Sequence, residues 1–486
     1  MSSNTSISDV SISIQEKAFI DVIPESKVGF KPTTVFIFAF ASIYFIAFVA
    51  AFDSGTSFLL TSAVSQPVIA GLSHVFGRKE ALLGFAVLFG LGSILAAVAN
   101  NFTLLLLGRS VQGIGGDGIL SLGEILVNDL VPLAVRGAYF GYMGSIWAIG
   151  SVGGSLMGGA SAQNVSWRWI FWINIPIIVS GAIAIIIFLK MNRTPGNLLA
   201  KVKKFDWISS VVFVSSTISF LIPITWGGVM YAWDSWRVLF PLLIGVAGIV
   251  AFAFYEKRLS DRAFDSEGET VVHGMVVWSL LYYLPLYYEA VQGYTPIISG
   301  VAVLPETGFV APMSVIVGVL VAATGRYRWA LWSGWTLVTF GAGLLYLLEP
   351  KTSIVQWVFL NIPISTGIGM LFPAMSLGNQ AASRPQDAGH AAALYAFTRV
   401  FGQAIGVAIG GVVFQNQIKE KLLSYPLFAS MATQYSKDAT ALVSLIKGMD
   451  DGLEKMQLKQ AYADSLKMLC VVMCALGGAA LISSSL

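Results

Sequence analysis

Long apolar runs follow one another along almost the whole chain, separated by short polar segments. About 20 apolar residues are needed to cross the hydrocarbon core of a bilayer as a helix, and most of the runs have this length. The pattern predicts an all-α integral membrane protein with fourteen spans. These are expected near residues 33–52, 56–75, 81–99, 102–127, 137–162, 169–189, 207–229, 237–255, 271–288, 296–323, 329–348, 354–382, 390–416 and 466–486.

Two segments lie outside this pattern. Residues 1–32 are rich in Ser and lack the basic-then-apolar order of a cleavable signal peptide, so we expect a disordered cytoplasmic tail. Residues 417–465 are polar and partly amphipathic, and we expect them to form a long outward loop.

The positions of basic residues predict the orientation of the chain. An even number of spans places both termini on one side, and most Lys and Arg of the short loops follow even-numbered spans. The opposite short loops hold only Arg168, Arg237 and Lys351. Because basic loops stay in the cytoplasm, both termini are predicted to be cytoplasmic. The plasma membrane is preferred over the vacuole as the location, although the sequence does not separate the two.

Composition agrees with a membrane protein and excludes several functions. Of the 486 residues, 56% are hydrophobic and 11% are charged, against about 25% charged residues in a soluble domain. The net charge of +3 is small and the basic residues are scattered, so no nucleic-acid partner is expected. Walker A, HExxH and paired-cysteine motifs are absent from the sequence, so we predict no enzyme, cofactor or metal site. A monomer is expected.

The stretch GIGGDG, Gly113 to Gly118, has the G-x-G-x-x-G spacing of a dinucleotide-binding turn. That turn follows a strand, whereas this stretch lies inside the apolar run 102–127, so the nucleotide interpretation fails. Gly113 and Gly116 share a helix face with Arg109. A charge at the middle of a bilayer costs about 2.5 kcal/mol or more, which suggests a function for Arg109; a fixed ion pair that locks two helices is the alternative.

Two acidic residues lie further along the same run. Asp117 and Glu124 are seven residues apart and therefore share a face close to that of Arg109. We expect both carboxyl groups to face a common polar cavity rather than lipid.

Glycines recur every four residues in two predicted spans. Gly150, Gly154 and Gly158 do so in the fifth span, and Gly402, Gly406 and Gly410 in the thirteenth, beside Arg399. Such spacing lets helix backbones approach closely, and ordinary helix packing is the simplest explanation. However, each half of the chain has both a glycine series and an intramembrane Arg, which is the symmetry of a transporter built from repeated halves.

Further motifs connect these features to one family. The loop sequences AGLSHVFGRK and GVLVAATGRY resemble the repeated G-x-L-a-D-r-x-G-r-k loop motif of the major facilitator superfamily. LGRSVQGIGG is similar to its R-x-x-Q-G-x-G-G motif, and WAIGSVGGSLMGG to its glycine-rich antiporter motif. WRWIFWINIP and LYYLPLYYEAVQGYTPIISGVAVLPET resemble the fungal, fourteen-span branch of drug:proton antiporters.

The resemblance implies two six-helix bundles, residues 33–190 and 271–486, with residues 205–256 as two inserted linker helices. It implies that proton coupling involves Arg109 and Asp53, to which we add Asp117 and Glu124 because of their place on the same helix; Asp117 stands where similar proteins usually have Gly. It implies that helix contacts and gating involve Gly113, Gly116, Gly150, Gly154, Gly158, His74, Gly77, Arg78, Lys79, Gly325, Arg326 and Arg399. The substrate cavity is expected to contain Gln112, together with Trp278 and Tyr282, which are one turn apart and suited to stacking on an apolar substrate; an interfacial aromatic belt is the alternative for span 9.

The chain also departs from the family pattern. His74 occupies the Asp position of the loop motif. Asp53, which belongs inside span 1, is followed almost at once by span 2, and an acidic stretch precedes span 9. The sequence therefore reads as if internal segments were absent at both places.

These observations favour a proton-coupled secondary transporter that exports amphipathic small molecules, such as drugs, toxins or secondary metabolites, by alternating access. Its partners are then the substrate, protons and the lipid bilayer. Two alternatives stay open. The same scaffold could carry out proton-coupled uptake, for example of a siderophore, and the shortened span 1 could leave an inert membrane protein.

Overall fold

The computed structural model describes residues 32–52, 56–191, 205, 207–228, 231–257, 267–382, 388–436 and 439–485. Within these ranges the chain is helical, and the only pairing of strand type is an isolated bridge between Gly227 and Tyr231. The expected tail up to residue 31, Asp53 and the acidic stretch at 258–266 lie outside the described residues.

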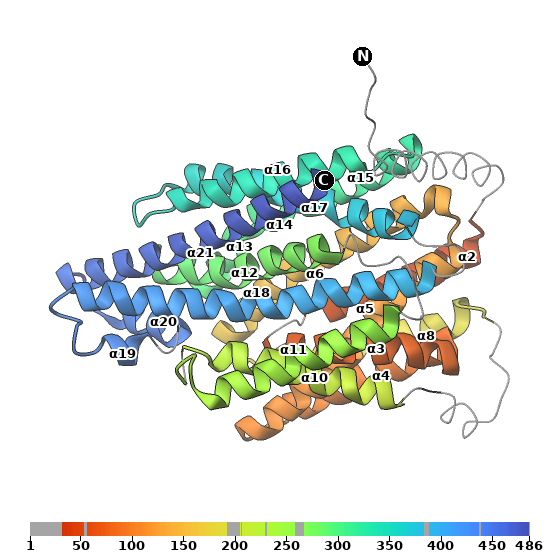
Figure 1. Ribbon diagram of the computed structural model, residues 1–486, viewed down its shortest axis with the longest axis horizontal. Helices are drawn as coiled ribbons and strands as arrows, with labels where there is room; N and C mark the ends of the chain where they lie inside the picture. The colour runs from red at the N-terminus through yellow and green to blue at the C-terminus, as the bar shows by residue number, and fades with distance from the viewer. Residues whose placement is uncertain are drawn as a thin grey trace, which may run out of the picture.

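The first helices surround α5, which contacts α2, α3 and α4. Most of them lie in the lower half of Figure 1, whereas α6 lies closer to its middle. Their bounds are α2 (Thr34–Phe52), α3 (Thr56–Phe76), α4 (Arg78–Ala97), α5 (Phe102–Leu130), α6 (Leu133–Asn164), α7 (Trp169–Trp172) and α8 (Asn174–Phe188).

A pair of helices, α10 (Trp207–Trp226) and α11 (Trp236–Lys257), packs together, and α10 contacts both α3 and α18. The later helices surround α12 and α17. Their bounds are α12 (Glu267–Ala290), α13 (Pro296–Ala302), α14 (Leu304–Gly308), α15 (Val310–Thr324), α16 (Arg328–Leu344), η1 (Leu345–Leu347), α17 (Ile354–Ala382), α18 (Ala388–Ser424), α19 (Ala432–Tyr435), α20 (Ala439–Gly448) and α21 (Leu453–Ser485).

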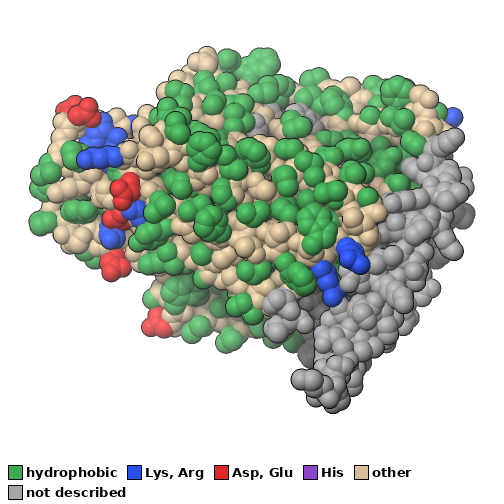
Figure 2. Space-filling model, turned by 90° about the horizontal axis from the view of Figure 1, so that it is seen from above, with side chains coloured by type: hydrophobic (Ala, Val, Ile, Leu, Met, Phe, Trp, Pro, Cys, Tyr) green, Lys and Arg blue, Asp and Glu red, His purple; other side chains and the backbone are tan. Residues whose placement is uncertain are grey.

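The helices have the length and composition of membrane spans. Among the described residues, eight helical segments are long and apolar enough to cross a membrane. Figure 2 shows hydrophobic side chains over the middle of the molecule, while acidic and basic side chains gather at its left end and further basic side chains lie toward the right. This distribution agrees with an integral, multi-pass membrane protein. The eight segments are Arg78–Ala97, Trp169–Phe188, Gly268–Ala290, Pro296–Thr324, Arg328–Leu347, Ile354–Gln380, Leu394–Ser424 and Leu453–Ser484.

The segment 417–465, expected as a loop, is largely helical. It holds the end of α18, the short helices α19 and α20, and the start of α21, and it lies at the left end of Figure 1. The amphipathic α20 packs against α12, and the ammonium group of Lys447 lies 2.6 Å from a carboxylate oxygen of Glu289. Apolar positions at helical spacing explain why this polar segment folds as helices.

Glycines set the distance between the most closely packed helices. A Cβ atom at Gly108 of α5 would lie 2.6 Å from the backbone nitrogen of Ala96 in α4. Cβ atoms at Gly402 and Gly406 of α18 would collide with the backbone oxygens of Val271 and Met275 in α12. The glycine series of α18 therefore serves the close approach of two helix backbones.

The two copies of the loop motif share one backbone feature. Gly77, between α3 and α4, has φ 107°, and Gly325, between α15 and α16, has φ 71°. Only glycine adopts such angles without strain. After Gly77, Arg78 pairs with Asp129 of α5 at 2.9 Å, and Lys79 donates to the Ile186 carbonyl oxygen.

The packing of α12 against α18 leads to a stability prediction. Gly406→Leu should force the two backbones apart and destabilise the protein by about 1–3 kcal/mol, the usual cost of overpacking. The midpoint of thermal unfolding in detergent measures this effect. Gly84→Leu in α4 is the matched control, because a Cβ atom at Gly84 meets no atom within 4 Å. Equal midpoints for the two variants would contradict the packing argument.

Candidate functional site

A buried ion pair joins two helices that are far apart in the sequence. The Arg399 guanidinium of α18 lies 2.5 Å from the Glu124 carboxylate of α5, measured between Nη2 and Oε1, and the side chains are only 8% and 3% exposed. The guanidinium also stands over the rings of Phe372 and Tyr395, at 5.0 and 5.6 Å from their centroids. Opposite charge and aromatic faces together compensate for removing Arg399 from water.

A second buried carboxyl group, that of Asp117, lies two turns earlier on α5. Its Oδ1 atom accepts a hydrogen bond of 2.7 Å from Gln66 Nε2 of α3, and the same amide lies 2.9 Å from Ser121 Oγ. Its Oδ2 atom has no hydrogen-bond partner among the described residues. Asp117 thus lacks the direct ion pair that Glu124 forms, although the Arg399 guanidinium also interacts with it electrostatically.

Arg109 lies in a separate group of polar side chains. Its Nη1 atom donates a 2.8 Å hydrogen bond to Gln112 Oε1, and Gln112 Nε2 donates in turn to Ser93 Oγ of α4 at 2.9 Å. The guanidinium carbon is 5.5 Å from the ring centroid of Phe171. The structure does not bring Arg109 to either carboxylate, since it lies about 12 Å along α5 from Asp117.

The glycines assigned to helix contacts have different surroundings. Gly113 and Gly116 are buried on α5, and the carbonyl oxygen of Gly113 accepts a hydrogen bond from Ser62 Oγ of α3. In α6, Gly150 is buried and Gly154 is partly buried, whereas a Cβ atom at Gly158 would meet only Ile170 at 4.0 Å.

The loop motif residues lie apart from the buried charges. His74 is exposed at the end of α3. The carbonyl oxygen of Arg326, in the second copy of the motif, accepts a hydrogen bond from Trp329 Nε1 at 2.9 Å.

The two aromatic residues assigned to the cavity do not share one environment. Trp278 is buried and packs edge to face on Trp147 of α6, with ring centroids 6.2 Å apart. Tyr282 is 37% exposed and contacts the ring of Tyr283. Of the two residues, Trp278 is therefore the one whose side chain reaches from α12 to α6.

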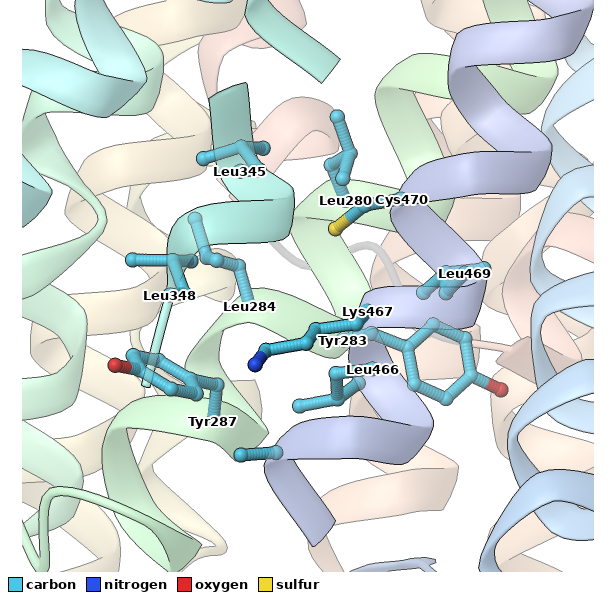
Figure 3. Close-up of a pocket in the computed structure, with 11 residues that line it drawn as sticks. Leu280, Tyr283, Leu284, Tyr287, Leu345, Leu348, Leu466, Lys467, Leu469 and Cys470 are labelled. Atoms are coloured by element: carbon cyan, nitrogen blue, oxygen red, sulfur yellow. The ribbon is translucent and has the colours of Figure 1, made fainter. Parts of the chain in front are cut away.

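A small, partly open pocket lies between α12, η1 and α21. Leucines, tyrosines and Cys470 line it, and Figure 3 shows the Lys467 side chain reaching across it. The ammonium group of Lys467 is 3.2 Å from the Glu349 carboxylate. Gln112, Trp278 and Tyr282 do not line this pocket.

Several polar residues of the interior were not predicted from the sequence to be buried. Gln66 and Ser62 belong to a polar face of α3, whose spacing of three to four residues within an apolar run is a usable signal. Arg136 was counted only as a loop charge, yet it donates to Gln380 of α17 and to the Asn128 carbonyl oxygen. Glu306 was also missed, although it is 2% exposed.

Comparisons with known proteins place the chain in a family. The profile of the Major Facilitator Superfamily matches residues 33–407. The chain is 51% identical over 448 residues to "MFS transporter L2" of Phoma sp., covering 90% of this chain and 75% of the relative. It is 35% identical over 430 residues to "MFS-type efflux pump LUC4" of Fusarium sp., covering 85% and 76% of the two chains.

Two further comparisons agree. The chain is 32% identical over 433 residues to "MFS-type efflux pump MMF1" of Mycosarcoma maydis, covering 85% of this chain and 68% of the relative. The crystal structure of the human organic anion transporter MFSD10 superposes with a TM-score of 0.53 at 14% identity, over 96% of this chain and 90% of that one, which shows a shared fold. The chain therefore belongs to the Major Facilitator Superfamily of membrane transporters.

Proposed function

We propose that this protein is a proton-coupled secondary transporter that exports amphipathic small molecules by alternating access. Relatives named as efflux pumps support the direction of transport. We further propose fourteen spans in two six-helix bundles, 33–190 and 271–486, joined by the linker helices in 205–256, with both termini in the cytoplasm and the plasma membrane as the location.

The observation that carries the coupling proposal is the imbalance of buried charge on α5. Arg399 forms an ion pair with Glu124, whereas Asp117 interacts with Arg399 only at longer range and is hydrogen-bonded to the Gln66 amide. An isolated carboxylate away from water is so costly that the group takes up a proton instead. Asp117 is then neutral while it is enclosed, and it releases its proton when the helices around it open to water.

The Glu124 to Arg399 pair links this proton to movement. It holds α5 to α18, so these helices can separate only if the pair opens and both charges find other partners or water. A proton or substrate that interacts differently with the closed and open arrangements shifts the balance between them. That is the requirement for exchanging a substrate against a proton.

The remaining predicted residues receive subsidiary roles. Arg109 and Gln112 are proposed to hold α5 against α4 through Ser93 and to adjust the polarity beside the pathway. Trp278 is proposed to contact the apolar part of the substrate. Arg78, through its pair with Asp129, is proposed to hold the cytoplasmic ends of α4 and α5 together.

Reconstitution into liposomes tests this function. The purified protein should move rhodamine 6G, an amphipathic fluorescent dye, against its concentration gradient when an opposite pH gradient is imposed, and a protonophore should abolish the movement. Coupled flux of the dye in the same direction as the protons would favour uptake. Absence of pH-dependent flux across a panel of amphipathic compounds would favour an inert protein.

A double-mutant cycle tests the buried pair. Glu124→Met alone leaves Arg399 buried without its partner and should destabilise the protein by about 3–5 kcal/mol. Glu124→Met combined with Arg399→Met should recover most of this loss, because two apolar side chains replace the pair, yet it should not recover pH-driven export. Thermal unfolding and dye flux are measured on the same samples. A double variant that transports normally would show that the pair has only a packing role.

Asp117→Asn tests the proposed proton site. The Asn side chain keeps an oxygen that accepts from Gln66, so the unfolding midpoint should stay close to that of the wild type. Gradient-driven export should fall to the rate of empty liposomes, because the amide does not exchange a proton. Asp450→Asn, at an exposed position, serves as the control. Wild-type flux in Asp117→Asn would remove Asp117 from the coupling mechanism.

A further inference from the structure

A buried carboxyl group that the coupling proposal does not use lies in the second half of the chain. Glu306, in α14, is 2% exposed, and its Oε2 atom has no hydrogen-bond partner among the described residues. Within the described part of the chain, no Lys, Arg or His forms an ion pair with it. Glu306 differs in this respect from Glu124, which has Arg399.

Glu306 lies deep within an apolar segment. The helices α13, α14 and α15 follow one another in the stretch Pro296–Thr324, which is apolar enough to span a membrane. Ten residues from its start, Glu306 is about 15 Å into the segment, which is half of the roughly 30 Å hydrocarbon thickness. Only single residues, Val303 and Phe309, separate α14 from α13 and α15, and both keep right-handed helical backbone angles, so the segment continues as one span.

The packing of α6 against α15 places Glu306 relative to the α6 glycines. A Cβ atom at Gly141 would lie 2.8 Å from the Ser314 carbonyl oxygen, and Ser145 Oγ donates to the Ala311 carbonyl oxygen at 3.0 Å. The helices therefore run antiparallel, and the same register continued along α6 brings Gly150 level with Glu306. Contact between α14 and α6 agrees with this placement.

The charged groups around Glu306 are few. Of the helices packed on α14, which are α6, α13, α15 and α17, only α6 contains a basic residue. That residue, Arg136, is fourteen residues from Gly150 and thus about 21 Å away along α6. The titratable side chains that interact electrostatically with Glu306 are Tyr288 of α12 and Cys470 of α21. Both are uncharged when protonated.

We propose that Glu306 is a second proton-binding carboxyl group, separate from Asp117, which holds its proton while α14 is packed against α6. Without a cation nearby, the carboxylate form would be too costly in these surroundings, and the protonated form is kept. Because Gly150, level with Glu306, adds no side chain to this contact, α6 can move along α13 and α14 and change the exposure of Glu306 to water. The use of this proton in transport rests on the proposed function, whereas its presence in the resting protein does not.

Infrared spectroscopy of the full-length protein in lipid nanodiscs tests the proposal without any substrate. Protein labelled with ¹³C-glutamate should show, at neutral pH, the carbonyl band of a protonated Glu side chain, shifted from the bands of Asp by the isotope. The band should weaken in Glu306→Gln and keep its intensity in Glu454→Gln, which removes an exposed carboxyl group. Glu306→Asp should replace it with an unshifted Asp band.

Two results would overturn the proposal. The first is the lack of a protonated Glu band in the wild-type protein at neutral pH. This result does not depend on whether any variant folds. The second is a band that is unchanged in Glu306→Gln, provided that the amide bands show a folded protein. The spectra are recorded without substrate, so they test the protonation of Glu306 and not transport. A failure of dye transport would therefore contradict the proposed function but not this proposal.

Discussion

The cost of placing charge in an apolar interior is the constraint on which this structure depends. A bilayer offers no water to a buried carboxylate or guanidinium, so each such group must be paired, hydrogen-bonded or neutralised by a proton. Arg399 and Glu124 satisfy the constraint through each other, and Arg136 does so through Gln380 and backbone oxygens. Asp117 and Glu306 form no direct ion pair among the described residues, which is why we assign protons to them.

The same constraint connects chemistry to motion. Helices packed through glycines can slide or tilt without filling or emptying large cavities, because their contact surfaces are flat. The buried charges add discrete preferences to this smooth packing, since an ion pair is either closed or open and a carboxyl group is either protonated or ionised. The two kinds of contact together suit a protein that changes between a few arrangements rather than one that adopts a single rigid state.

The sequence predicted much of the fold because hydrophobic length and glycine position act locally. Helices lie where the apolar runs are, and Gly77 and Gly325 adopt the backbone angles that only glycine tolerates at the ends of matching loops. The pairing of side chains could not be predicted in this way. Arg399 and Glu124 are separated by 275 residues, and the local sequence of either span does not identify its partner.

The candidate site shows the same division. Spacing along α5 correctly grouped Asp117 with Glu124 on a buried face, but it did not indicate that Gln66 of α3 would contact Asp117. Arg109 lies about two turns of α5 before Asp117, and its guanidinium is directed to Gln112 and Phe171 instead of the two carboxyl groups. Glu306 was missed although it lies inside the predicted span 296–323, because no basic residue at helical spacing or neighbouring acidic residue drew attention to it.

The central claim is that protonation of buried carboxyl groups changes how α5 and α18 are arranged. Spin labels at Phe102 of α5 and Leu423 of α18, both at exposed positions, allow the distance between these helices to be measured by pulsed electron paramagnetic resonance in nanodiscs. The account predicts that the distance distribution shifts between neutral and acidic pH, and that Asp117→Asn together with Glu306→Gln removes the shift. A distribution that is the same at every pH in the wild-type protein would contradict it.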